Sequence, residues 1–135
     1  MSGRPPCPPG LPAACRLHAF DQLTSTNDEA RRLAQDGAPE GTLVWALEQT
    51  AGRGRRGRAW ASERGNLYVT AILRPTSDLG TAAQLGFASA LALAEAFETV
   101  LPSGRLVRLK WPNDVLVRGR KAAGILLETV MDPDA

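Results

Sequence analysis

Four arginines and three glycines alternate closely in the segment 52–58, which reads GRGRRGR. The glycines remove side chains, so backbone N–H groups can turn inward and surround oxygen atoms. The guanidinium groups are planar, permanently charged and match the geometry of phosphate. This segment, the arginine loop, is therefore a candidate cradle for a small anionic ligand. Short basic runs are common, so composition alone supports a solvated loop or an RNA-contacting tract as strongly as it supports an anion cradle.

A second polar group follows in the segment 110–114, which reads KWPND, with Lys121 a few residues later. The Asp114 carboxylate could hold a metal ion, accept from a ribose, or take a proton from an attacking amine. Lys121 could place positive charge beside a reacting carboxylate. By spacing alone, the simpler interpretation of Asn113 and Asp114 as a turn pair is favoured.

The triplet Ser25, Thr26 and Asn27 lies at the start of a predicted helix. Free N–H groups and the helix dipole at such a position attract an electronegative ligand atom. The alternative is ordinary N-capping, which is far more common. Trp60, which follows the arginine loop, could close over the apolar part of a ligand or pack in the core.

The elements that must position these residues follow from periodicity and from turn residues. Thr26 and Glu29 form a capping box that starts a helix, and Gly37 with Pro39 ends it. A second helix is expected at 82–101. Strands are expected at 42–48, 66–74 and 106–110, and as two hairpin arms at 114–117 and 122–128 around a turn at 118–120. This order predicts an α+β domain with a mixed, mainly antiparallel sheet and helices on one side.

Composition indicates one folded domain, because 135 residues with 44% hydrophobic and 22% charged side chains fit a globular protein. No apolar run approaches the roughly 18 residues that span a membrane. Residues 1–15 are proline-rich and should form a disordered leader, which lacks the apolar stretch of a signal peptide. We therefore expect a cytoplasmic protein. A net charge of +2 argues against a general nucleic-acid binder, and no aromatic residue interleaves the loop arginines.

Taken together, the order and spacing of these motifs resemble the catalytic domain of biotin–protein ligases (biotin–[acetyl-CoA-carboxylase] ligases). The resemblance covers about residues 20–128 and is carried by STN, EQTAGRGRRGRAW, GNLY, KWPNDV and RKAAGILLE. It implies a fold like that of class II aminoacyl-tRNA synthetases and biotin ligases. Residues 16–135 would form the N-terminal part of such a domain, incomplete at its C-terminus because the family's GIGxN-type strand, further helices and SH3-like domain are not present. No winged helix-turn-helix precedes Phe20, so no DNA-binding domain is expected.

The resemblance also implies a reaction. With magnesium, ATP and biotin would form biotinyl-5′-adenylate, and biotin would then pass to one lysine of a biotin carboxyl carrier domain of a carboxylase. Two alternatives stay open: a catalytically dead fragment that binds biotin or adenylate, and an acyl transferase like the lipoate–protein ligases. The oligomeric state, monomer or homodimer, is also open.

Site residues follow from the resemblance, position by position. The implied catalytic residues are Lys121, Arg53, Arg55 and Asp114. The implied biotin contacts are Ser25, Thr26, Asn27, Gln49, Gly52, Arg53, Lys121, Gly124 and Ile125. The implied ATP and adenylate contacts are Arg53, Arg55, Arg58, Trp60, Asn113 and Asp114. Magnesium would be held by Asn113 and Asp114.

Overall fold

The computed structural model describes residues 10–102 and 106–131, and these divide between two compact units. Unit 1 comprises Met1–Arg74 with Val130–Ala135, and unit 2 comprises Pro75–Thr129. Each unit is described by itself. The predicted leader falls largely on residues 1–9, which lie outside the described residues. Its described part, residues 10–15, contains no helix or strand.

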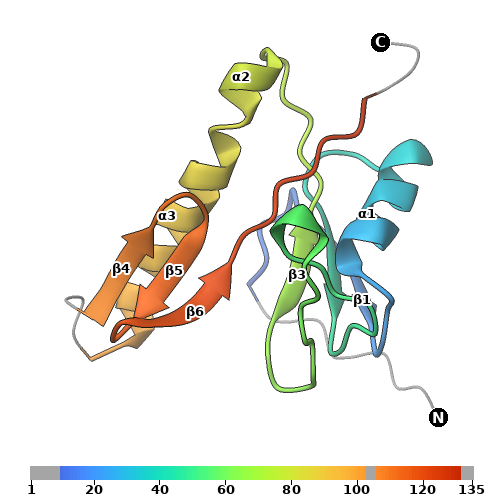
Figure 1. The fold of residues 1–135 in the computed structure, drawn as a ribbon. Helices are drawn as coiled ribbons and strands as arrows, with labels where there is room; N and C mark the ends of the chain where they lie inside the picture. Colours follow the sequence, from blue (N-terminus) through green and yellow to red (C-terminus); the bar gives the residue numbers. More distant parts are fainter. Residues whose placement is uncertain (1–9, 103–105, 132–135) are drawn as a thin grey trace. The chain divides into compact units, whose positions relative to one another are not determined.

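Unit 1 is built on a three-stranded sheet in the order β1-β2-β3 (Figure 1). The strands are β1 (Arg16–Phe20), β2 (Thr42–Ala46) and β3 (Tyr68–Ala71). β1 and β2 are parallel, whereas β2 and β3 are antiparallel. A parallel pair needs a long crossover connection, and helix α1 (Thr26–Gln35) is part of that connection.

The core of unit 1 lies between α1 and one face of this sheet. Along β2, residues 42, 44 and 46 are buried while their neighbours are only partly buried, which is the period-two pattern of a strand. Val44 is fully buried and packs with Ala30 of α1 and with Ile72. One small hydrophobic core therefore holds α1 against the sheet.

Helix α1 has its N-cap one residue earlier than the capping box predicts. Ser25 is the N-cap, and its hydroxyl accepts a hydrogen bond from the Asp28 N–H at 3.4 Å. The prediction that Thr26 caps the helix with Glu29 is wrong, because Thr26 is the first helical residue and Glu29 pairs with Arg32. The predicted C-terminal end is confirmed, since the chain leaves α1 at Gly37, which has a φ of +87°.

Unit 2 is an antiparallel sheet with a long helix against it. Its strands are β4 (Val107–Lys110), β5 (Asp114–Val117) and β6 (Arg120–Gly124), in the order β4-β5-β6. Helix α3 (Leu85–Val100) packs on this sheet through Ala90 and Ala94, which contact the fully buried Val115. The small alanine side chains let the helix and the sheet approach closely.

Two predicted elements of unit 2 have different bounds in the structure. The predicted helix 82–101 corresponds to α3, which begins three residues later, and a separate short helix α2 (Leu79–Ala82), capped by Asp78, precedes it. The predicted hairpin arm 122–128 is wrong: the two-residue turn Arg118–Gly119 has positive φ angles at both positions, so β6 starts at Arg120 and ends at Gly124. The register also shifts between Val115 and Leu116.

The α+β class is confirmed, with the described strands in one mixed and one antiparallel sheet and a helix packed on each. Strand β1 was not among the predicted elements, β5 has the predicted bounds, and the other strands are shorter than predicted. Among the described residues, no helix is both long and apolar enough to span a membrane.

The first prediction concerns the core of unit 1. Val44→Ala should lower the free energy of unfolding by about 2–3 kcal/mol, because it leaves a cavity around a fully buried side chain. Val69→Ala on β3 is the matched control, since Val69 is 46% exposed, and it should cost less than about 1 kcal/mol. Urea unfolding followed by circular dichroism measures both. Equal losses would contradict the assignment of the core to this face of the sheet.

Candidate functional site

In unit 1, a buried polar cluster joins the first turn of α1 to the loop after β2. The Gln49 side-chain carbonyl accepts hydrogen bonds from the Thr26 N–H at 2.8 Å and from the Thr26 hydroxyl at 3.1 Å. The Gln49 amide nitrogen donates to the Ser62 hydroxyl at 3.0 Å, and that hydroxyl donates to the Trp60 carbonyl at 3.0 Å. Thr26 and Gln49 are thus bonded directly, and Ser62, which the sequence did not single out, links Gln49 to Trp60.

Gly52 lies directly on this cluster, and its lack of a side chain is required by space. A Cβ atom at this position would lie 2.6 Å from the Trp60 carbonyl oxygen and 3.1 Å from the Gln49 amide nitrogen, and it would also collide with the Ser62 hydroxyl. The first glycine of the arginine loop is therefore needed for close packing of backbone against the polar cluster.

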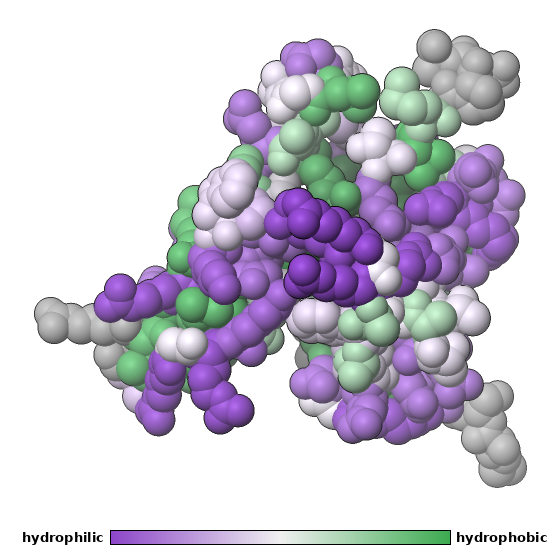
Figure 2. Space-filling view, viewed as in Figure 1, coloured by the Kyte–Doolittle hydropathy of each residue, from purple (hydrophilic) through white to green (hydrophobic). Residues whose placement is uncertain are grey.

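The arginine loop itself forms a small hairpin. Arg53 and Ala59 form an antiparallel bridge, the Gly54 N–H donates to the Arg58 carbonyl at 2.7 Å, and the Trp60 N–H donates to the Gly52 carbonyl at 2.9 Å. A short 3₁₀ turn, η1 (Arg55–Gly57), forms the tip. The tip arginines at 55, 56 and 58 are exposed, and Figure 2 shows the most hydrophilic side chains gathered over η1.

Arg53 differs from the tip arginines because it is held by a carboxylate. Its two terminal nitrogens donate to the two oxygens of Asp28, each at 2.8 Å. The guanidinium hydrogen bonds hold the pKa of Asp28 below its usual value, against the opposing effect of partial burial. Asp28 directly follows the Ser25–Asn27 triplet, yet sequence reasoning did not include it, because its partner is 25 residues away.

A second unpredicted residue, Thr70 of β3, also contacts the start of α1. Its hydroxyl lies within hydrogen-bonding distance of the Thr26 hydroxyl, at 2.9 Å, and of the Asn27 side-chain oxygen. Ser25 and Thr26 are both buried. The polar atoms at this helix start therefore face one another and the sheet, and the interpretation of Ser25 as an ordinary N-cap is confirmed as one of its roles.

The predicted residues of unit 2 gather around the β5–β6 pair. Lys121 Nζ lies 2.7 Å from the Asp114 carboxylate, and Asp114 is directly opposite Gly124 in the ladder. Asn113 binds the backbone of Ile125 twice. Its side-chain nitrogen donates to the Ile125 carbonyl at 2.6 Å, and its backbone carbonyl accepts the Ile125 N–H at 2.9 Å. The alternative of an isolated Asn113–Asp114 turn pair is wrong, since Asp114 begins a strand.

These contacts limit how a magnesium ion could be held. Among the described residues, no three His, Cys, Asp or Glu side chains gather as a metal site. Mg²⁺ that accompanies a nucleotide usually needs only one or two protein oxygens, together with phosphates and water. The Asp114 carboxylate and the side-chain oxygen of Asn113 fit that shared arrangement, but not a site made by protein alone.

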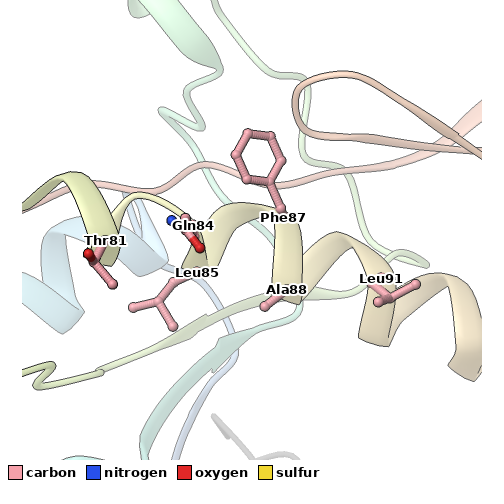
Figure 3. A pocket seen from close by; sticks show the side chains of 6 residues that line it. All are labelled: Thr81, Gln84, Leu85, Phe87, Ala88 and Leu91. Atoms are coloured by element: carbon pink, nitrogen blue, oxygen red, sulfur yellow. The ribbon is translucent and has the colours of Figure 1, made fainter. Parts of the chain in front are cut away.

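A separate open hollow of about 700 Å³ lies on the helices of unit 2. It runs from the end of α2 along the first turns of α3 (Figure 3), and it is lined by Thr81, Gln84, Leu85, Phe87, Ala88 and Leu91. Its lining is mostly apolar and includes none of the predicted site residues.

Comparison with known proteins now bears on these clusters. The model of the biotin/lipoate A/B protein ligase family matches residues 19–133. This chain belongs to that family. The matched range contains both polar clusters and the whole arginine loop, and it confirms the resemblance to biotin–protein ligases drawn from the motifs.

Relatives and solved structures within this family agree with the assignment. The chain is 50% identical over 105 residues to the biotin–[acetyl-CoA-carboxylase] ligase of Paracoccus denitrificans, covering 78% of this chain and 43% of that protein. A biotin protein ligase from Leishmania major in complex with biotin matches with a TM-score of 0.76 and 34% identity, over 93% of this chain and 54% of that one. The Aquifex aeolicus ligase in complex with biotin and ATP matches with a TM-score of 0.69 and 36% identity, over 84% and 46%. The chain thus spans about half the length of these family members.

The second prediction tests the close packing at Gly52. Gly52→Ala should destabilise the protein by about 1–3 kcal/mol, because a backbone carbonyl must move away from the new methyl group. Gly54→Ala is the matched control within the same loop, since its Cβ would meet nothing closer than 3.7 Å. Thermal unfolding of the two variants measures the difference. A Gly52→Ala variant as stable as Gly54→Ala would contradict this packing.

The third prediction concerns the ionisation of Asp28. Arg53→Gln should raise the pKa of the Asp28 carboxyl toward its usual value, because the guanidinium no longer stabilises the charged form. Since the folded-state pKa is lowered, the stabilisation from this pair is present above the unfolded-state pKa and is lost as pH falls through the lowered value. An NMR titration of the carboxyl carbon measures the shift. An unchanged titration midpoint would show that the pair does not form in solution.

Proposed function

We propose that this protein activates biotin with ATP to biotinyl-5′-adenylate and transfers biotin to a specific lysine of a biotin carrier protein. The observation that carries the proposal is the arrangement in unit 1: an arginine loop whose base is fixed on a buried polar cluster and whose tip arginines are exposed. Membership of the biotin/lipoate ligase family supports it. A related ligase solved with biotinyl-5-AMP, at 34% identity, supports the identity of the intermediate.

In the first step, a carboxylate oxygen of biotin attacks the α-phosphorus of ATP, and pyrophosphate leaves. Both reactants are anions, so the protein must neutralise charge and hold the reacting atoms in line. Lys121 and Arg53 are assigned to the biotin carboxylate and the α-phosphate. Arg55 and Arg58 are assigned to the phosphates, where exposed guanidinium groups are free to close over a ligand.

Biotin recognition is assigned mainly to the polar cluster of unit 1. The head group of biotin is a cyclic urea, which both donates and accepts hydrogen bonds. Residues 25–27 offer hydroxyl and amide groups at a helix N-terminus, and Gln49 and Gly52 lie beside them. Gly124 and Ile125 are assigned to the apolar side of the biotin pocket.

The nucleotide and the second step are assigned to the remaining residues. Trp60 is 39% exposed and can stack against the adenylate. Asn113 and Asp114 would hold Mg²⁺ together with the phosphates, and the ion would supply further charge neutralisation. In the second step, the carrier lysine amine attacks the acyl carbon, AMP leaves, and Asp114 takes the amine proton. A cytoplasmic location and a partner from a biotin-dependent carboxylase complete the proposal.

The fourth prediction tests this function with the 135-residue chain. Incubation with biotin, Mg²⁺ and ATP labelled at the α-phosphate should yield biotinyl-5′-adenylate and pyrophosphate. Lys121→Ala should reduce the rate by about 100-fold or more, as expected when one preorganised cation is removed from a developing charge. Arg120→Ala, the neighbouring basic residue on β6, is the control and should retain activity.

The outcomes separate the proposal from its alternatives. Saturable biotin binding without pyrophosphate release would contradict the proposal and indicate a biotin-binding module. Competition by lipoate but not by biotin would instead indicate an acyl transferase of the lipoate type. If the chain binds neither biotin nor lipoate, the proposed function does not hold for this chain.

A further inference from the structure

Asp28 has no role among the residues assigned to biotin, nucleotide or magnesium, yet it makes a specific contact with the arginine loop. Both of its carboxylate oxygens accept hydrogen bonds from Arg53, in a parallel two-pronged arrangement with each distance at 2.8 Å. Such bidentate pairs fix the orientation of the guanidinium plane as well as neutralising charge. The Arg53 and Asp28 side chains are 32% and 40% exposed, so the pair is partly shielded from water.

The position of this ion pair in the loop is as informative as its geometry. Arg53 is the first residue of the hairpin, because it forms the bridge to Ala59 and directly follows the buried Gly52. Asp28 lies in the first turn of α1, two residues after Thr26, which binds Gln49. The same helical turn is therefore tied to the loop twice, once by neutral hydrogen bonds and once by an ion pair.

The remaining loop arginines are not held in this way. Within the described residues, no carboxylate pairs with the arginines at 55, 56 and 58, and all three side chains are exposed. One carboxylate at the base thus neutralises one guanidinium and leaves the three at the tip to face an anion. A loop with a fixed base and a charged tip can close on a ligand with a smaller loss of conformational entropy than a loop that is free throughout.

We propose that Asp28 is a positioning residue that holds Arg53, and with it the base of the arginine loop, against the first turn of α1. Because this contact fixes the base of the loop, the tip arginines bind the phosphates of the nucleotide from a defined position. The nature of that ligand rests on the proposed function, whereas the anchoring of the loop does not.

The test uses two readouts on the 135-residue chain. The first is amide hydrogen exchange of Gly54 and Trp60 by NMR, since both N–H groups close the hairpin. Asp28→Asn should speed this exchange about two- to fivefold, the range expected for loss of a partly exposed ion pair. Arg53→Gln should do the same, and the double variant should exceed neither single variant, because one contact is lost in all three.

Asp36→Asn is the matched control. Asp36 lies just after the same helix and pairs with the exposed Arg32 at 2.7 Å, away from the loop. Its loss should leave the exchange of Gly54 and Trp60 unchanged. Unchanged exchange in Asp28→Asn, or additive effects in the double variant, would overturn the proposal.

The second readout is the dissociation constant for ATP measured by calorimetry. Asp28→Asn should weaken ATP binding about two- to fivefold, whereas Asp36→Asn should not. Tighter ATP binding in Asp28→Asn would overturn the proposal, because Asp28 would then compete with the phosphates for Arg53. If no variant and no unmodified chain forms adenylate, the proposed function fails, but the exchange measurement still decides whether Asp28 anchors the loop.

Discussion

The side chain of Gln49 is the contact on which the arrangement of unit 1 depends. Its carbonyl accepts from both the backbone and the hydroxyl of Thr26, and its amide nitrogen donates to Ser62. These atoms are buried or partly buried, so loss of one partner would leave the others without hydrogen bonds in a place that water reaches poorly. A primary amide suits this position because it carries a donor and an acceptor on one rigid plane. The Gln49 amide therefore holds the start of α1 and the loop after β2 in a fixed relative position.

From this neutral cluster the loop passes to increasingly charged and exposed positions. Gly52 is buried against the amide, Arg53 is partly exposed and paired, and the arginines of the tip face solvent. This gradient lets a strongly basic loop exist on a small unit, because guanidinium groups in water cost little and repel one another weakly. The same charges become effective when a phosphate displaces the water between them. In the proposed function, the polar cluster would hold the loop in place and the tip arginines would provide the affinity for phosphate.

The features predictable from the sequence were those specified by local chemistry. Helix α1 ends at Gln35, and Gly37 two residues later adopts the positive φ that favours glycine. The order of the motifs was enough to indicate the family. The contacts that sequence reasoning missed are long-range: Asp28 reaches Arg53 across 25 residues, and Thr70 reaches Thr26 across 44. Strand β1 was missed because its evidence is its parallel pairing with β2, which no local pattern reports. The start of β6 was misplaced because the two-residue turn at Arg118–Gly119 demands positive φ at an arginine.

The central claim is that the arginine loop and the cluster beneath it bind biotin and its adenylate. The most direct test is an NMR titration of the isotope-labelled 135-residue chain with biotin, followed by ATP and Mg²⁺. We predict saturable shifts of the Thr26 and Gly52 amides and of the Gln49 side-chain NH₂ group on addition of biotin. The nucleotide should then shift the amides of the loop tip. Shifts confined to the apolar hollow at Phe87 and Leu91, or no shifts at all, would contradict the claim.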